Sequence, residues 1–237
     1  MKTTINNKHN NIEKSDEQKQ INGFQLIENY LTKEQEALLF NNINQQKWVV
    51  DYQRRLQYYN YRNEHVYPYN LIPIPDKIPD FLNELIDRIV NDHIVENKFD
   101  QIIVNEYKPG EGLKPHFDRK DYFQNIIVGV SLNSATTMEF YNEKTSPDGC
   151  QKKSILIPRR SLYVLKDDAR YVWKHGISSK KYDIVNGIRT ERKVRVSITF
   201  RNVVESKIKQ ENIIYPESKI LGPKHTQIAH AFTKICK

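Results

Sequence analysis

The stretch VRVSITFRN, residues 194–202, alternates apolar and polar side chains without interruption. Successive side chains of a β-strand point to opposite faces, so one face holds Val196, Ile198 and Phe200 and the other holds Arg195, Ser197, Thr199 and Arg201. One interpretation is an outward strand with solvated arginines. The other is that the arginines face the interior, where an unpaired guanidinium is very costly and must hold an anion. Because a guanidinium grips a carboxylate with a planar fork, a dicarboxylate would satisfy both arginines.

Further short segments rich in Ile, Val, Tyr and Phe precede this strand from about residue 100 onward. They are QIIVNEY, NIIVGVSL, TTMEFYN, KSILIP, SLYVLK and YVWKHGI, and turn residues such as PGEG, SPDG, PRR and KDD separate them. A loop is expected immediately before VRVSITF. Several short strands at this spacing predict a sandwich or barrel.

Two helices are predicted before the strands. Thr32 and Gln35 have the spacing of a capping box, and Leu38, Leu39 and Ile43 can share one face of the helix that follows. The segment PDFLNELIDRIVND begins with Pro79, which suits a first helical turn. Its apolar stripe consists of Phe81, Leu82, Leu85, Ile86, Ile89 and Val90. The fold class expected is therefore α+β and mainly β.

Composition limits the cellular context. The chain has 237 residues, enough for one domain with ragged ends, and its 11% aromatic content argues against wholesale disorder. A formal net charge of +8 favours anionic partners, nucleic acid first and an acidic membrane surface second, although an A/T-rich genome that loads the chain with Asn, Ile and Lys would also produce it. With two distant cysteines, Cys150 and Cys236, and neither a signal peptide nor a long apolar run, we expect an intracellular, cytoplasmic or nuclear monomer without membrane association.

The segment KPHFDRKDYF, residues 114–123, contains a His-x-Asp pair, His116 and Asp118. Residues two apart on an extended segment point the same way, so both side chains can approach one metal ion. Among the other histidines, His175 is the one in a predicted strand of the β region, 59 residues later (175 − 116 = 59). Two histidines and one carboxylate form the facial triad of non-haem Fe(II) oxygenases. The alternative is a surface turn carrying HFD, with a structural His175.

In this order, HFD, HGI and RVSITFR resemble the AlkB family of Fe(II)- and 2-oxoglutarate-dependent dioxygenases, whose pattern is H-x-D, a distal His and R-x5-R. NEY, residues 105–107, is similar to the family's N-x-Y. The resemblance covers roughly residues 20–203. PRRSLYVLKDDARYVWKHGI and RRLQYYNYRN look most like the AlkB-type domain of the tRNA wobble-uridine hydroxylases. The fold that this implies is a double-stranded β-helix, or jelly roll, with supporting N-terminal helices.

The resemblance also implies the contents of the site. Fe(II) would bind the two histidines and the aspartate, with 2-oxoglutarate and O2 as cosubstrates. Arg195, helped by Tyr107, would pair with the far carboxylate of 2-oxoglutarate, while Arg201 and Asn105 would hold the other end. Ser197 stands where other members place Asn and could still donate a hydrogen bond.

The segment RRLQYYNYRN combines phosphate-binding charge with rings that can stack on bases, and in the family it forms a lid over the base. Candidate substrate contacts are Arg54, Arg55 and Tyr58. The alternative is an amphipathic strand pair with half-buried tyrosines. Arg170, shortly before the distal histidine, could position substrate or Asp118.

The function expected from the resemblance is hydroxylation or oxidative dealkylation of a modified nucleobase, in tRNA or other RNA more than in DNA. A dioxygenase of the same fold acting on protein or lipid and a non-catalytic binding module remain alternatives. The animal members of this branch also carry an RNA-recognition motif, a methyltransferase domain and a cysteine-rich zinc site. Because only Cys236 follows the last arginine, no structural zinc is expected.

The chain divides into four expected parts. Residues 1–20 form a disordered polar tail, 21–97 the N-terminal helices and substrate lid, 98–203 the dioxygenase jelly roll, and 204–237 a basic tail.

Overall fold

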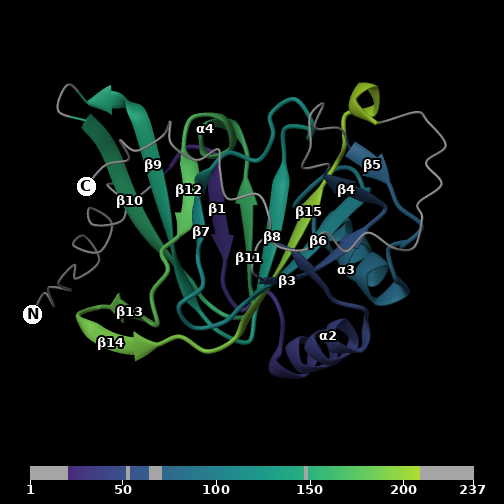
Figure 1. Ribbon diagram of the computed structural model, residues 1–237, viewed down its shortest axis with the longest axis horizontal. Coiled ribbons are helices and arrows are strands. Elements are labelled where there is room, and N and C mark those ends of the chain that lie inside the picture. The colour runs from purple at the N-terminus through teal and green to yellow at the C-terminus, as the bar shows by residue number, and fades with distance from the viewer. Residues whose placement is uncertain (1–20, 52–53, 64–70, 147–148, 209–237) are drawn as a thin grey trace, which may run out of the picture.

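The computed structural model describes residues 21–51, 54–63, 71–146 and 149–208 (Figure 1). Both predicted tails lie largely outside these residues, as does Cys236, so nothing in the structure bears on them. The described chain consists mainly of antiparallel strands with a few helices, which confirms the predicted α+β, mainly β class.

Two antiparallel sheets build the body of the fold. The larger has seven strands in the order β1 (Phe24–Ile27), β11 (Ser161–Leu165), β8 (Ile127–Leu132), β15 (Arg195–Arg201), β6 (Gln101–Tyr107), β3 (Arg54–Tyr59) and β2 (Val49–Asp51). The smaller has four, in the order β10 (Gly149–Ile157), β9 (Thr136–Ser146), β12 (Lys174–Ile177) and β7 (Leu113–His116). Two separate hairpins pair β4 (Tyr61–Asn63) with β5 (Leu71–Pro73), and β13 (Tyr182–Val185) with β14 (Ile188–Glu191).

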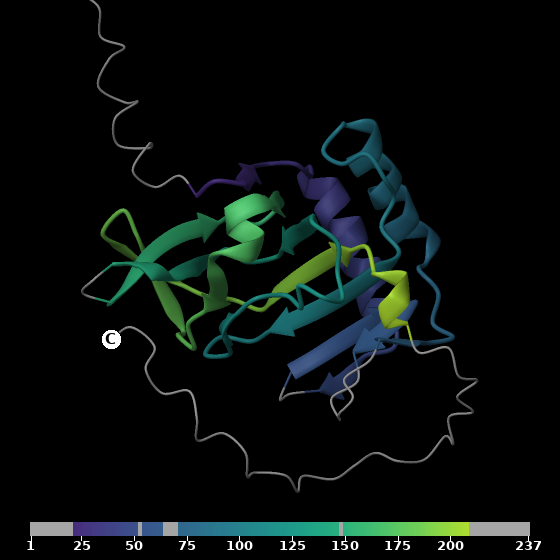
Figure 2. The ribbon, with the colours of Figure 1, turned by 90° about the horizontal axis from the view of Figure 1, so that it is seen from above.

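Two helices cover the outer face of the larger sheet (Figure 2). The predicted capping box starts α2 (Lys33–Gln45), since Thr32 Oγ1 accepts from the Gln35 amide and the Gln35 side chain accepts from the Thr32 amide. In α3 (Asp80–Asn91), Pro79 is the residue just before the first turn rather than inside it. With α4 (Asp167–Tyr171) and the 3-10 turn η2 (Glu205–Lys207), these are the helices of the described residues, and none is long and apolar enough to cross a membrane.

The alternation along β15 places its two faces in different environments. Val196, Ile198 and Phe200 are fully buried in the core between the larger sheet and helices α2 and α3. The opposite face is also buried, with Arg195 3% exposed and Arg201 8% exposed. The interpretation with solvated arginines is therefore wrong, and both guanidiniums point into the space between the sheets.

Some elements differ from the sequence expectation. A loop does precede β15, at residues 192–194, but the sequence prediction did not include the β13–β14 hairpin before it, whose turn residues Asn186 and Gly187 have φ angles of 51° and 79°. Asn-Gly between strands is the usual signal of such a turn, so the sequence contained the information. The larger sheet also takes β1, β2 and β3 from residues before 98, so the predicted boundary there does not separate the sheets from the N-terminal part.

Candidate active site

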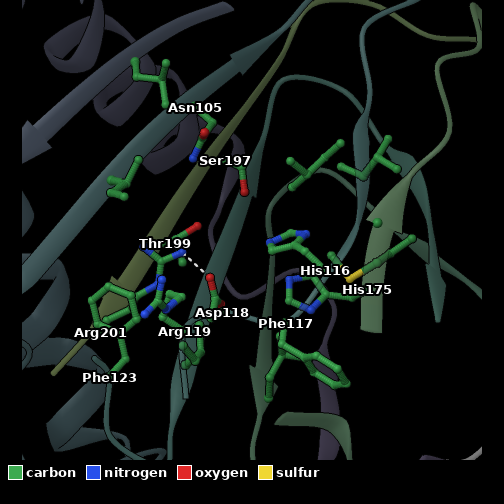
Figure 3. Close-up of a pocket in the computed structure, with 18 of the residues that line it drawn as sticks. Asn105, His116, Phe117, Asp118, Arg119, Phe123, His175, Ser197, Thr199 and Arg201 are labelled. Carbon is green, nitrogen blue, oxygen red and sulfur yellow. Dashed lines mark hydrogen bonds and ion pairs between the residues drawn. The ribbon is translucent and has the colours of Figure 1, made fainter. Parts of the chain in front are cut away.

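A pair of imidazoles marks one wall of a cavity between the two sheets. His116, the last residue of β7, lies directly opposite His175 of β12 in the antiparallel ladder, and their ring centroids are 4.5 Å apart (Figure 3). Pairing of β12 with β7 in the smaller sheet thus brings together two histidines that are 59 positions apart in the chain (175 − 116 = 59). The sequence prediction that these two histidines converge is confirmed by this register.

Each ring can offer a nitrogen to a metal ion. The Nδ1 of His116 lies 3.0 Å from the carbonyl oxygen of Lys114, which can only accept, so Nδ1 is the donor in this contact and Nε2 is the nitrogen that can bind a metal ion. Shielding from water lowers the pKa of His175 to about 3, and the neighbouring His116 acts in the same direction. His175 is therefore uncharged near neutral pH and can donate electrons to a metal ion.

Asp118 follows β7 and is buried at 7% exposure. Arg201 donates to its Oδ1 at 2.6 Å, as the dashed line in Figure 3 shows. Burial raises the pKa of Asp118, but nearby positive charge, that of Arg201 first, outweighs burial, so the pKa falls below its ordinary value and the carboxylate is ionised.

The donor set fits Fe(II) by chemistry, since two imidazoles and one ionised carboxylate line the same cavity. Their present arrangement is looser than a formed metal centre: among the described residues, no three His, Cys, Asp or Glu side chains are grouped closely enough to hold an ion as they stand. In Asp118, Oδ1 accepts a hydrogen bond from Arg201. Coordination by all three would require the Asp118 side chain to turn or to share its second oxygen.

The opposite wall is a grid of side chains from neighbouring strands of the larger sheet. Arg195 of β15 pairs with Tyr107 of β6. Two positions further along β15, Ser197 pairs with Asn105. Arg195 donates to Ser131 Oγ at 2.9 Å and to Ser197 Oγ at 3.3 Å. Ser131 was missed in the sequence because it sits in an apolar strand, and only the β8–β15 pairing shows what it contacts.

Tyr107 keeps its proton in this wall. Burial raises the pKa of its hydroxyl, although Arg54 and Arg195 act in the opposite direction. A protonated hydroxyl can donate a hydrogen bond to an anion that the arginines attract.

The cavity between these walls measures about 380 Å³, in the usual range for small-molecule sites. Figure 3 shows Asn105 and Ser197 on one side of it and the two imidazoles on the other. The sequence-predicted residues that line it are His116, Asp118, His175, Asn105, Tyr107, Arg195, Ser197, Arg201, Arg54 and Tyr58.

Two predicted substrate residues lie elsewhere. Arg55 points away from the cavity, forms an ion pair with Glu106 and stacks on Trp48, because it alternates with Arg54 along β3. Arg170 is 2% exposed and does not line the cavity. Its two terminal nitrogens donate to backbone carbonyls of the segment after β7, at 2.7 Å to Asp118, 3.1 Å to Arg119 and 3.4 Å to Phe123. Of the two roles considered for Arg170, positioning of Asp118 is the one that this location favours.

The predicted lid residues are also part of the sheet. Arg54–Tyr59 is β3, which pairs with β6 over Leu56–Tyr59 and with β2 over its first residues, rather than a separate cover, and Tyr61–Asn63 is β4 of a separate hairpin. Tyr58 lines the cavity and Tyr59 is buried in the core on the other face.

Comparison with known proteins agrees with this site. Residues 9–201 match the family model of the 2OG-Fe(II) oxygenase superfamily. The chain belongs to this superfamily. Its members use Fe(II), 2-oxoglutarate and O2, so the chain is a dioxygenase, and the predicted enzyme class and cofactors are confirmed.

Several relatives of this dioxygenase are named as AlkB homologues, which confirms the family resemblance. A mouse protein named tRNA (carboxymethyluridine(34)-5-O)-methyltransferase ALKBH8 is 30% identical over 209 residues, covering 76% of this chain but 30% of the mouse protein. The uncharacterized protein L905 of Acanthamoeba polyphaga mimivirus is 61% identical over 199 residues, covering 84% of this chain and 93% of that protein. The solved structure of OsALKBH1 has a TM-score of 0.53 at 14% identity, covers 76% of this chain and 98% of that one, and supports the jelly-roll fold.

Proposed function

We propose that this AlkB-type dioxygenase hydroxylates or oxidatively dealkylates a modified nucleobase, in tRNA or another RNA more readily than in duplex DNA. The observation that carries the proposal is the meeting, in one cavity, of two cross-strand imidazoles, a buried ionised carboxylate and the inward arginines of β15. Three observations support a nucleic-acid substrate: the name of the mouse relative, the formal net charge of +8, and Tyr58, whose ring lines the cavity.

The proposed metal ligands are Nε2 of His116, a carboxylate oxygen of Asp118 and His175. Bound Fe(II) would supply oxidation by O2, in which 2-oxoglutarate becomes succinate and CO2, and one oxygen atom enters a substrate C–H bond. If that bond belongs to an N-methyl group, the hydroxymethyl product releases formaldehyde. If it belongs to a carbon substituent, the alcohol remains.

The remaining groups bind and orient. Arg195 and the protonated Tyr107 would hold the far carboxylate of 2-oxoglutarate, with Ser131 and Ser197 fixing the Arg195 side chain. Arg201 and Asn105 would hold the end near the metal. Burial of this wall excludes water, so each charge-assisted hydrogen bond is stronger than it would be in solvent.

The test is turnover with defined nucleic acids. Purified protein would be incubated with Fe(II), 2-oxoglutarate and total tRNA, while succinate is measured and nucleosides are compared by mass spectrometry. We expect succinate release that tRNA stimulates, a mass change in one nucleoside, and loss of both in His175→Ala. Failure of tRNA, single-stranded RNA and DNA of either kind to stimulate turnover would contradict the proposal and favour a protein or lipid substrate.

A further inference from the structure

Arg54 occupies an unusual place for a residue expected to meet substrate. The β3–β6 register pairs Leu56 with Asn105, and continuing it by two residues puts Arg54 beside Tyr107. Tyr107 in turn pairs with Arg195 on its other side. One row across three adjacent strands therefore reads Arg195, Tyr107, Arg54, and all three line the cavity.

The two guanidiniums of this row meet at the same ring. The Cζ of Arg54 lies 5.2 Å from the centroid of Tyr107, and that of Arg195 lies 5.6 Å from it. Because both cations approach one buried side chain, they place two positive charges at one end of the cavity. Arg201 lies six positions further along β15, about 20 Å away along the backbone, at the metal-facing end.

Within the described part of the chain, neither cation has a carboxylate partner. Arg195 bonds to two serine hydroxyls, and Arg54 has one long contact, 3.5 Å from NH1 to the carbonyl of Gly112. The Nε of Arg54 is buried and has no hydrogen-bond partner among the described residues. A buried guanidinium nitrogen without a hydrogen-bond partner is costly, so this end of the cavity is built for an anion with several acceptor atoms.

Arg55, the next residue along β3, differs from Arg54 in having a carboxylate partner. Arg55 faces the other side of β3, where both its Nε and NH2 donate to the carboxylate of Glu106. Glu106 thus neutralises Arg55, whereas Arg54 has no carboxylate partner among the described residues and can bind a ligand.

We propose that Arg54 is a second cation for the distal carboxylate of 2-oxoglutarate, acting beside Arg195 and Tyr107. The inference rests on the proposed role of Arg195 in the same site. Two guanidiniums and one hydroxyl offer enough donors to saturate both oxygens of a carboxylate, whose four lone-pair directions a single arginine cannot fill. Arg54 is then a specificity residue that makes the site prefer a 2-oxo diacid over a 2-oxo monoacid.

The test compares two ligands that differ only at that carboxylate. Binding of 2-oxoglutarate and of 2-oxopentanoate to the full chain, loaded with Mn(II) and without O2, would be measured by calorimetry. We expect Arg54→Gln to weaken the binding of 2-oxoglutarate at least tenfold and the binding of 2-oxopentanoate less than twofold. The preference for the diacid then shrinks. Arg54→Lys keeps a charge and should retain part of the preference, which also covers the case in which Arg54→Gln does not fold.

Arg62→Gln is the matched control, because Arg62 lies on β4 in the same segment but is exposed and does not line the cavity. It should bind both ligands as the unchanged protein does. Equal weakening of both ligands in Arg54→Gln, or unchanged binding of both, would overturn the role of Arg54. If the unchanged protein itself shows no preference for 2-oxoglutarate, the proposed cosubstrate site fails as a whole, and the Arg54 proposal fails with it.

Discussion

Asp118 and Arg201 form an ion pair across 83 residues of sequence, with the guanidinium 2.6 Å from the carboxylate and both side chains at most 10% exposed. The pair joins the segment after β7 to the end of β15 and therefore ties the two walls of the cavity together. It also explains why a residue of the proposed metal centre is ionised although it is buried.

We expect Arg201→Ala to lower the free energy of unfolding by about 3–5 kcal/mol, because it leaves the buried Asp118 carboxylate without its partner. Arg195→Ala removes bonds to two neutral hydroxyls and should cost less, about 1–3 kcal/mol. Denaturant unfolding of the metal-free proteins measures both. Equal losses would show that the ion pair is not what distinguishes the two arginines.

Arg170 should act on the metal through the backbone. Its donors hold three carbonyls of the segment that carries Asp118, so Arg170→Ala should loosen that segment. We expect Mn(II) or Co(II) affinity to fall about tenfold or more, as for other groups that orient a metal ligand. Amide exchange over residues 118–123 should accelerate in the same variant, and the exposed Arg189→Ala on β14 serves as the control. A stability loss with unchanged metal affinity would restrict Arg170 to a structural role.

The candidate site could be predicted from sequence where local periodicity determines which way a side chain points. The alternation of β15 separates Arg195 and Arg201 from Val196 and Ile198 whatever the sheet order. The capping box at Thr32 depends on four consecutive residues and is likewise local.

What could not be predicted depends on register between distant strands. Arg54 and Arg55 are equivalent in the sequence, and only the pairing of β3 with β6 shows that one faces the cavity and the other Glu106. Arg170 is similar: a cation near a histidine suggests substrate binding, but its burial against backbone carbonyls is set by the placement of α4 in the fold.

Glu139 of β9 should control stability in acid. Burial raises its pKa, but hydrogen bonds from Ser178, Tyr141 and Lys152 prevail and lower it to about 2. Since the folded-state pKa lies below the unfolded value, the stabilisation is complete above about pH 4.5 and is lost as pH falls towards 2.

Glu139→Gln should therefore lower the unfolding free energy at pH 7 by about 1.5–3 kcal/mol and flatten its decline between pH 4.5 and 2. Unfolding curves at a series of pH values measure this. Glu143→Gln, on the same strand but half-exposed, should leave the acid decline unchanged. Identical slopes for Glu139→Gln and the unchanged protein would contradict the assignment.

Gly129 of β8 lies directly opposite Tyr163 of β11, and the tyrosine ring covers the glycine. A Cβ at position 129 would overlap ring atoms of Tyr163, which is 6% exposed and lines the cavity, so Gly129→Ala must push the ring out of place. We expect a loss of about 1–3 kcal/mol in unfolding free energy from this overpacking, together with weaker 2-oxoglutarate binding.

The double variant Gly129→Ala with Tyr163→Val removes the ring that the new methyl group meets. Its loss should therefore be smaller than the sum of the two single losses, a coupling that a double-mutant cycle measures directly. Strictly additive losses would mean that the ring does not set the requirement for glycine.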